Sequence, residues 1–293
     1  MLTVFERLSN SWELVKASYG VVRSHRQLLL YPLISMLATL VVMIVFAIPL
    51  FASGVVSAAS SGDELTSGQS IVSVVLAFLF YFAMYTVIIF SNTALVGASL
   101  RHMQGKPATL RDGFQIASER INTILGYAAI SATVGVILNA IRDEDNFLSQ
   151  ILASIVSVAW NLITFLVIPV LVVENVGPIE AIKRSGSLLK RTWGEQVVGT
   201  FSISMVFGLI TLLVVLVIGL PLFMLLAATG SAALIILGVV LVVFIVMAIN
   251  LFGTTLNGVF QAALYRYATN DITEGETDEY FDESLLRNAF HPR

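Results

Sequence analysis

The chain has 293 residues, of which 57 % are hydrophobic types and only 12 % are charged, and its mean hydropathy is +0.89. Soluble domains carry about 25 % charged residues, so this composition excludes an ordinary soluble enzyme and a disordered chain. The absence of cysteine excludes zinc-thiolate sites, iron–sulfur clusters, disulfides and thiol nucleophiles.

Long charge-free stretches predict the membrane-spanning helices. Lys, Arg, Asp and Glu are absent between Arg26 and Asp63, Glu64 and Arg101, Arg120 and Arg142, Asp145 and Glu174, and Glu195 and Arg266. A bilayer core about 30 Å thick needs about 20 helical residues, so the first four stretches hold one span each and the longest holds two. The spans are predicted near 28–57, 70–100, 121–141, 148–173, 196–227 and 232–266, with a reversal at 227–231.

Three prolines fall inside these spans or near their ends. Pro49, Pro169 and Pro221 each remove a backbone amide, and neighbouring helices can compensate for that loss in a membrane. We therefore expect kinks at these positions rather than breaks.

The basic residues lie almost entirely on one side of the predicted spans. The segments on this side contribute Arg7, Lys16, Arg23 and Arg26, then Arg101, Lys106, Arg111 and Arg120, then Lys183, Arg184, Lys190 and Arg191, and finally Arg266, Arg287 and Arg293. Arg142 alone lies on the opposite side. The positive-inside rule places the basic side and both termini in the cytoplasm, which predicts a multi-pass protein of the cell membrane.

The basic segments themselves have helical periodicity. Apolar residues recur at steps of three and four over 5–22, 110–124 and 179–193, with charged residues on the other face. Thr109 and Asp112 have the spacing of an N-cap pair, and Pro178 suits a first helical position. The unit of amphipathic helix, span, outer turn and span is thus predicted three times, near 1–103, 104–174 and 175–268.

The fold class predicted from these patterns is an all-α integral membrane protein with six transmembrane helices in one domain, 1–268. Each of its three repeats begins with a cytoplasmic, amphipathic interfacial helix. The remaining residues, 269–293, form an acidic tail, which we expect to be a solvated cytoplasmic segment.

The amphipathic helices allow two interpretations. They dock against the ends of their own spans as structural elements, or they offer cations to anionic lipid headgroups or to a membrane-protein partner. The candidate headgroup contacts are Lys16, Arg23, Arg26, Arg101, Arg111, Arg120, Lys183, Arg184, Lys190 and Arg191.

The middles of the spans contain neutral polar residues but no ionisable ones, whereas ion-coupled transporters usually carry at least one. The second, fourth and sixth spans supply a candidate polar seam of Asn92, Asn161, Asn250, Thr254 and Asn257. One interpretation is interhelical hydrogen bonding, at about 0.6 kcal/mol for each bond. The other is a polar path through the membrane.

No catalytic or metal-binding constellation is apparent in the sequence. His25, His102 and His291 lack the spacing of metal ligands, and triads or paired carboxylates cannot be assembled inside the membrane. We expect no catalytic residues, no metal site and no cofactor. Because the basic side faces lipid, nucleic acid is not an expected partner.

The two ends of the chain carry a family resemblance. Residues 5–12, 14–18, 263–268 and 281–290 resemble those of a family of prokaryotic six-span integral membrane proteins of unknown function. The repeated unit is more distantly similar to the membrane domain of some glycerophosphodiester phosphodiesterases, whose catalytic domain is not in this chain. The resemblance implies a six-span fold and carries over no catalytic residues.

The sequence therefore favours a non-enzymatic membrane protein that organises lipid, anionic lipid in particular, or a membrane-protein partner, with homo-oligomers as a further form of assembly. The alternative is a small-solute transporter or channel whose path follows the Asn/Thr seam of spans 2, 4 and 6. An enzyme that acts on lipid is the weakest reading, because acid and base groups are confined to the surface. A continuous polar cavity at the seam would favour transport.

Overall fold

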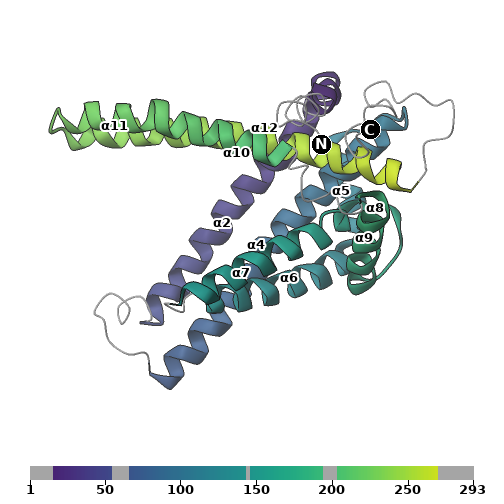
Figure 1. Ribbon diagram of the computed structural model, residues 1–293, viewed down its shortest axis with the longest axis horizontal. Helices are drawn as coiled ribbons and strands as arrows, with labels where there is room; N and C mark the ends of the chain where they lie inside the picture. Colours follow the sequence, from purple (N-terminus) through teal and green to yellow (C-terminus); the bar gives the residue numbers. More distant parts are fainter. Residues whose placement is uncertain (1–15, 55–65, 143–145, 194–202, 270–293) are drawn as a thin grey trace.

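The computed structural model describes residues 16–54, 66–142, 146–193 and 203–269, and these residues form helices and turns without strands (Figure 1). Residues 16–24 are helical. The elements that follow are η1 (Arg26–Leu29), α2 (Leu30–Ala52), α4 (Ser67–Met103), α5 (Leu110–Glu119), α6 (Ile121–Arg142), α7 (Phe147–Ile163), α8 (Val167–Val173), α9 (Pro178–Trp193), α10 (Ile203–Val214), η3 (Val215–Gly219), α11 (Leu220–Ala227) and α12 (Ala232–Ala268).

Within the described residues, six stretches of helix are long and apolar enough to cross a membrane. They are Arg26–Ala52, Ser67–Met103, Ile121–Arg142, Phe147–Val173, Phe207–Ala227 and Ala232–Arg266. These stretches confirm six helices of spanning length, as in a multi-pass membrane protein. Residues 55–57 of the first predicted span and 196–202 of the fifth lie outside the described part. The predicted reversal is also confirmed, since α11 ends at Ala227 and α12 begins at Ala232, with Gly230 in the left-handed region at φ 68°.

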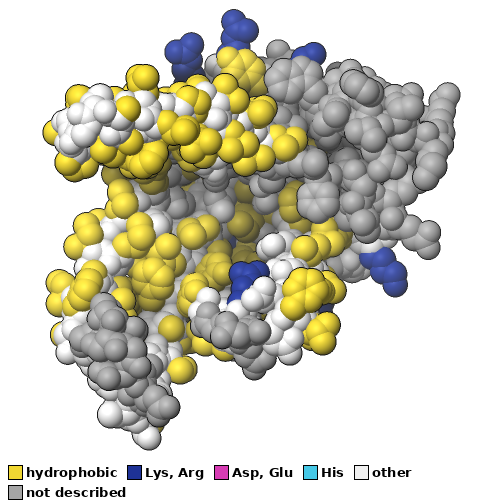
Figure 2. Space-filling model, turned by 60° about the vertical axis from the view of Figure 1, so that its left-hand side comes forward, with side chains coloured by type: hydrophobic (Ala, Val, Ile, Leu, Met, Phe, Trp, Pro, Cys, Tyr) yellow, Lys and Arg dark blue, Asp and Glu magenta, His cyan; other side chains and the backbone are white. Residues whose placement is uncertain are grey.

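The middle and far parts of the spans expose apolar side chains. Ile48 and Phe244, for example, are each 71 % exposed. Figure 2 shows hydrophobic side chains over much of the described surface in view, whereas Lys and Arg side chains project at its upper and right-hand edges and also appear within its lower half. Such a surface is unfavourable in water and suits lipid chains, which are as apolar as the side chains they contact.

Helix α4 is the centre of the arrangement, because it contacts α2, α5, α6, α8 and α12. Figure 1 shows α2, α4, α6 and α7 running broadly together, while the hairpin of α10, α11 and α12 extends in a different direction. The two groups meet at the C-terminal half of α12, and the buried core lies at that junction. Its largest fully buried side chains include Tyr31, Leu95, Ile124, Phe260 and Leu264.

Helices α5 and α9 pack on this core with one face buried. The predicted cap of α5 is confirmed, because the Asp112 amide donates to Thr109 Oγ1 (3.3 Å) and the Thr109 amide to Asp112 Oδ2 (2.8 Å). In α9 the buried side chains, among those described, are Ala181, Ser185, Leu188 and Leu189. Of the first predicted amphipathic helix, 5–22, only residues 16–22 lie within the described part, and the acidic tail lies outside it except for residue 269.

The prolines have different effects in the three spans. Pro49 lies inside α2 without interrupting it, and Pro221 follows the π-helical turn η3, which is the kind of local distortion expected beside a proline. The expectation of a kink at Pro169 is wrong, because the fourth span is interrupted at 164–166 between α7 and α8. The interruption is stabilised from outside the span, since the Leu166 amide donates to Ser185 Oγ in α9 at 3.0 Å.

Candidate functional site

The cations flanking the spans gather at the packed end of the molecule, which we call the basic end. It comprises the charged residues of 16–26, of α5 and α9, and of the last turns of α4 and α12. Arg101 pairs with Asp112 (3.6 Å) and Arg184 with Glu174 (3.0 Å). The Tyr265 hydroxyl also donates to Glu174 Oε1 at 3.1 Å, so one carboxylate links α8, α9 and α12.

Three of the ten candidate headgroup contacts have structural partners. Arg101 and Arg184 are in these ion pairs, and Arg120 donates to the Asn175 side chain. A further six are exposed and, within the part of the chain that the structure describes, have no hydrogen bond or ion pair: Lys16, Arg23, Arg26, Arg111, Lys183 and Lys190. The Arg191 side chain lies outside the described part. We call this group of six the free cations.

Asp112 is held as a carboxylate at the start of α5. Hydrogen bonds from the Thr109 hydroxyl and amide lower its pKa below the ordinary value, and the nearby Arg101 and Arg111 act in the same direction. The carboxylate therefore stays charged down to low pH. It neutralises part of the field of Arg101 and of Arg111, and the Arg111 side chain is exposed.

Two histidines that are far apart in the sequence lie together at the basic end. The rings of His25 and His102 stack with centroids 5.0 Å apart, and the Ser24 hydroxyl lies 3.1 Å from His102 Nε2. Each histidine is adjacent in the sequence to an arginine at the end of a predicted span. This was the one signal in the sequence that both histidines lie on the same side of the membrane. No group of three or more metal-binding side chains occurs among the described residues.

An apolar groove of about 750 Å³ lies beside Lys16. Its walls come from the helix of residues 16–24 and from α10 and α12, and include Tyr19, Phe207, Phe244 and Phe252. Lys16 is exposed and has the one charged side chain among the residues that line the groove. The groove thus places a cation beside a surface that suits hydrocarbon chains.

A second cavity, of about 390 Å³, lies where α2, α4 and α12 meet, and we call it the polar cleft. It brings together three of the predicted seam residues, Asn92, Asn250 and Thr254. It also includes Ser35 and Thr39 of α2, which the sequence reasoning missed because it considered only the second span of each repeat. Their i, i+4 spacing on one face of the first span was the available signal.

The other two predicted seam residues do not line the polar cleft. Asn161 is exposed on α7, and Asn257 is half-buried on α12 about two turns from Asn250. The structure therefore joins the second and sixth spans of the predicted seam with the first span. The fourth span does not contribute to this cavity.

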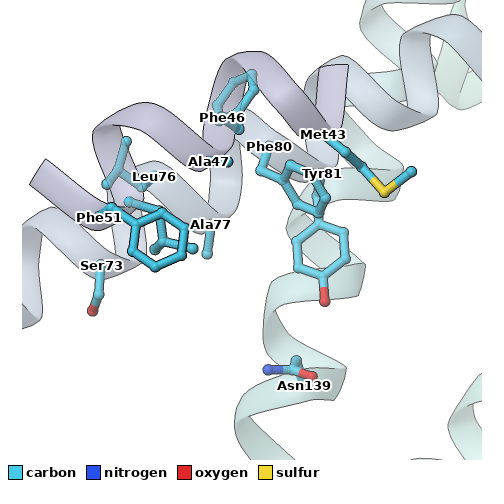
Figure 3. A pocket seen from close by; sticks show the side chains of 11 residues that line it. Met43, Phe46, Ala47, Phe51, Ser73, Leu76, Ala77, Phe80, Tyr81 and Asn139 are labelled. Carbon is cyan, nitrogen blue, oxygen red and sulfur yellow. The ribbon is translucent and has the colours of Figure 1, made fainter. Parts of the chain in front are cut away.

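An aromatic pocket of about 380 Å³ lies between α2, α4 and α6, towards the end opposite the basic end (Figure 3). Phe46 and Phe80 meet edge to face with ring centroids 5.7 Å apart. In Figure 3 the Tyr81 side chain points towards the turn of α6 that carries Asn139. None of the predicted site residues lines this pocket.

Comparison with known proteins gives one family match. The model of a family of unknown function, DUF6159, matches residues 71–275. Neither a curated protein nor a solved structure matches the chain. The comparisons thus support the resemblance to a family of unknown function, and they provide no evidence for the one to glycerophosphodiester phosphodiesterases.

Proposed function

The chain belongs to the family of unknown function DUF6159, and we propose that it is a non-enzymatic membrane protein that gathers anionic lipid around its basic end. The observation that carries this proposal is the exposure of the free cations and their lack of acidic partners among the described residues. They are exposed on segments whose opposite faces are buried, and no carboxylate of the described residues pairs with them. Exposed cations at a membrane surface attract anionic headgroups.

The packing of α5 and α9 supports a cationic surface whose basic side chains are held in a fixed direction. Gly113 and Ala117 of α5 and Ala181 and Ser185 of α9 are buried against the core, so each helix is held in one rotation about its axis. The basic side chains Arg111, Lys183 and Lys190 are exposed. We propose that both helices lie at the membrane interface, as the first elements of two of three internal repeats.

The apolar groove provides a surface for lipid acyl chains beside the basic residues. An anionic lipid that places its headgroup near Lys16 has an adjoining surface for its acyl chains between residues 16–24, α10 and α12. The proposal therefore names lipid, rather than a protein, as the main partner of the basic end. We further propose that this end is cytoplasmic, where anionic lipids give the membrane surface a negative potential.

The alternative, transport of a small solute along the Asn/Thr seam, has less support. A path through the membrane needs a continuous polar lining, and Asn161 and Asn257 lie outside the polar cleft. None of the described residues that line the cleft is charged, so an ion would lose its hydration there without compensation.

The proposal is tested by lipid selectivity in reconstituted membranes. Spin-labelled phosphatidylglycerol and spin-labelled phosphatidylcholine are compared for association with the purified chain by electron paramagnetic resonance. We expect selection of phosphatidylglycerol that weakens as salt is raised, because the screening length falls from about 10 Å at 0.1 M to about 3 Å at 1 M. A variant with all six free cations replaced by Gln should lose most of the selectivity.

Arg142→Gln is the matched control. Arg142 is the basic residue at the opposite end of the spans and donates to the Ser157 hydroxyl at 2.8 Å. This variant should retain the selectivity of the wild type. Equal association of the two lipids with the wild-type chain at low salt would refute the proposal.

A further inference from the structure

The polar cleft holds more hydrogen-bonding groups than the protein itself uses. Of its five polar side chains, Ser35, Thr39, Asn92 and Thr254 have no hydrogen bond among the described residues. Asn250 uses its amide nitrogen to donate to the Val246 carbonyl at 2.8 Å. In soluble proteins water would satisfy such groups, but hydrocarbon offers them no partner.

The cleft lies deep within the membrane-spanning part of the chain. Ser35 is nine positions after Arg26, Asn92 nine before Arg101, and Thr254 twelve before Arg266. At 1.5 Å per helical residue, Ser35 and Asn92 are about 13 Å and Thr254 is about 18 Å along their helices from these arginines. That depth approaches the middle of a hydrocarbon core about 30 Å thick.

The cleft is also open to the surroundings of the helices. The side chains of Asn250 and Thr254 are exposed and that of Asn92 is half-exposed, while apolar residues such as Met36 and Ile88 form the remaining wall. Its volume of about 390 Å³ falls in the range of about 300–1,000 Å³ found for ligand pockets. A ligand can therefore enter sideways from the membrane.

We propose that the polar cleft binds an uncharged membrane lipid that carries hydroxyl and ester carbonyl groups, the chemistry of a diacylglycerol. The Asn92 amide and the Ser35, Thr39 and Thr254 hydroxyls supply donors for the carbonyls and acceptors for the hydroxyl. A charged phosphate is disfavoured at this depth, because the lining contains no Lys or Arg to pair with it. This inference goes beyond the proposed function, which concerns anionic lipid at the basic end.

The test uses a photoreactive diacylglycerol with the full chain in lipid nanodiscs. After illumination, digestion and mass spectrometry locate the labelled residues. We expect labels in the segments 32–39 and 246–254, and at least a fivefold loss of this labelling when excess dioleoylglycerol competes. Excess dioleoylphosphatidylglycerol should compete much less.

Two substitutions and one control identify the groups responsible. Asn92→Leu should reduce labelling of the cleft several-fold, and Thr39→Val, which removes a hydroxyl while nearly keeping the shape, should reduce it less. Asn161→Leu makes the same exchange as the first variant on α7, outside the cleft, and should leave labelling unchanged. Thermal unfolding of each variant verifies that it is folded.

Three outcomes would overturn the inference: no label in these segments, equal competition by phosphatidylglycerol, or unchanged labelling in both folded cleft variants. The variant that lacks the six free cations should keep its diacylglycerol labelling, and Asn92→Leu should keep its selection of phosphatidylglycerol. Failure of this inference is thereby separable from failure of the proposed function.

Discussion

At the scale of single residues, α5 packs closely where it crosses α4 and α2. The Tyr31 hydroxyl donates to the carbonyls of Thr109 (3.3 Å) and Leu110 (3.2 Å), which brings the start of α5 against α2. A Cβ added at Gly113 would lie 2.6 Å from the Ala94 carbonyl oxygen and would also collide with the Tyr31 ring. The glycine is therefore required by its neighbours rather than by its own backbone conformation.

We predict that Gly113→Ala destabilises the chain by about 1–3 kcal/mol, because the backbone of α4 and the buried Tyr31 ring must both move to accept one methyl group. Thermal unfolding in detergent, followed by tryptophan fluorescence, measures the change. Gly208→Ala on α10 is the control, since no atom of the described residues lies within 4 Å of the added Cβ. It should be neutral or stabilising by about 0.5–1 kcal/mol. Equal unfolding temperatures for both variants would contradict the packing argument.

At this scale, the sequence predicts the interactions whose partners are close together along the chain. The cap formed by Thr109 and Asp112 is readable because its partners are three positions apart. The polar cleft and the stacked His25 and His102 rings are not, because their members come from different spans. The periodicity of a single helix does not determine which faces of two helices pack together.

At the scale of elements, the fourth span depends on a helix that follows it. The span is interrupted at 164–166, and Pro169 cannot supply the amide that would bond to the Phe165 carbonyl in a continuous helix. The Leu166 amide instead donates to Ser185 Oγ, where both residues are buried. Hydropathy predicts the existence of this span but not its interruption, because the stabilising hydroxyl belongs to α9.

We predict that Ser185→Ala lowers the free energy of unfolding by about 1–3 kcal/mol, since it leaves the buried Leu166 amide without its acceptor. Ser187→Ala, on the exposed face of the same helix, should change it by less than about 0.5 kcal/mol. Thermal unfolding in one detergent compares the two variants. If both melt together with the wild type, the hydrogen bond does not hold the interruption in place.

At the scale of the whole molecule, the structure is packed at one end and open towards the other. The buried core lies among the ends of α2, α4 and α12 and the helices α5, α8 and α9, while the remaining lengths of the spans expose apolar side chains. Charge-free stretches predict the six spans well because membrane thickness fixes their length. The different direction of the α10–α12 hairpin follows from contacts between spans, which the sequence pattern does not contain (Figure 1).

The last prediction concerns the orientation of the molecule in the membrane. Because the sequence contains no cysteine, single introduced cysteines can test it. Single cysteines are introduced as Gln115→Cys in α5 and Thr229→Cys in the turn between α11 and α12, both at exposed positions. An impermeant maleimide should label the second variant in intact cells, because the positive-inside rule places the basic end in the cytoplasm. It should label the first only after the membrane is permeabilised.

The cysteine-free parent chain sets the background, and permeabilised cells show that both positions can react. The reverse pattern would place the free cations on the outer surface. The negative potential of the cytoplasmic leaflet could not then act on Lys183 or Arg111, and the proposed gathering of anionic lipid would lose its electrostatic basis. The polar cleft would be unaffected, since an uncharged lipid near the middle of the membrane is reached from either leaflet.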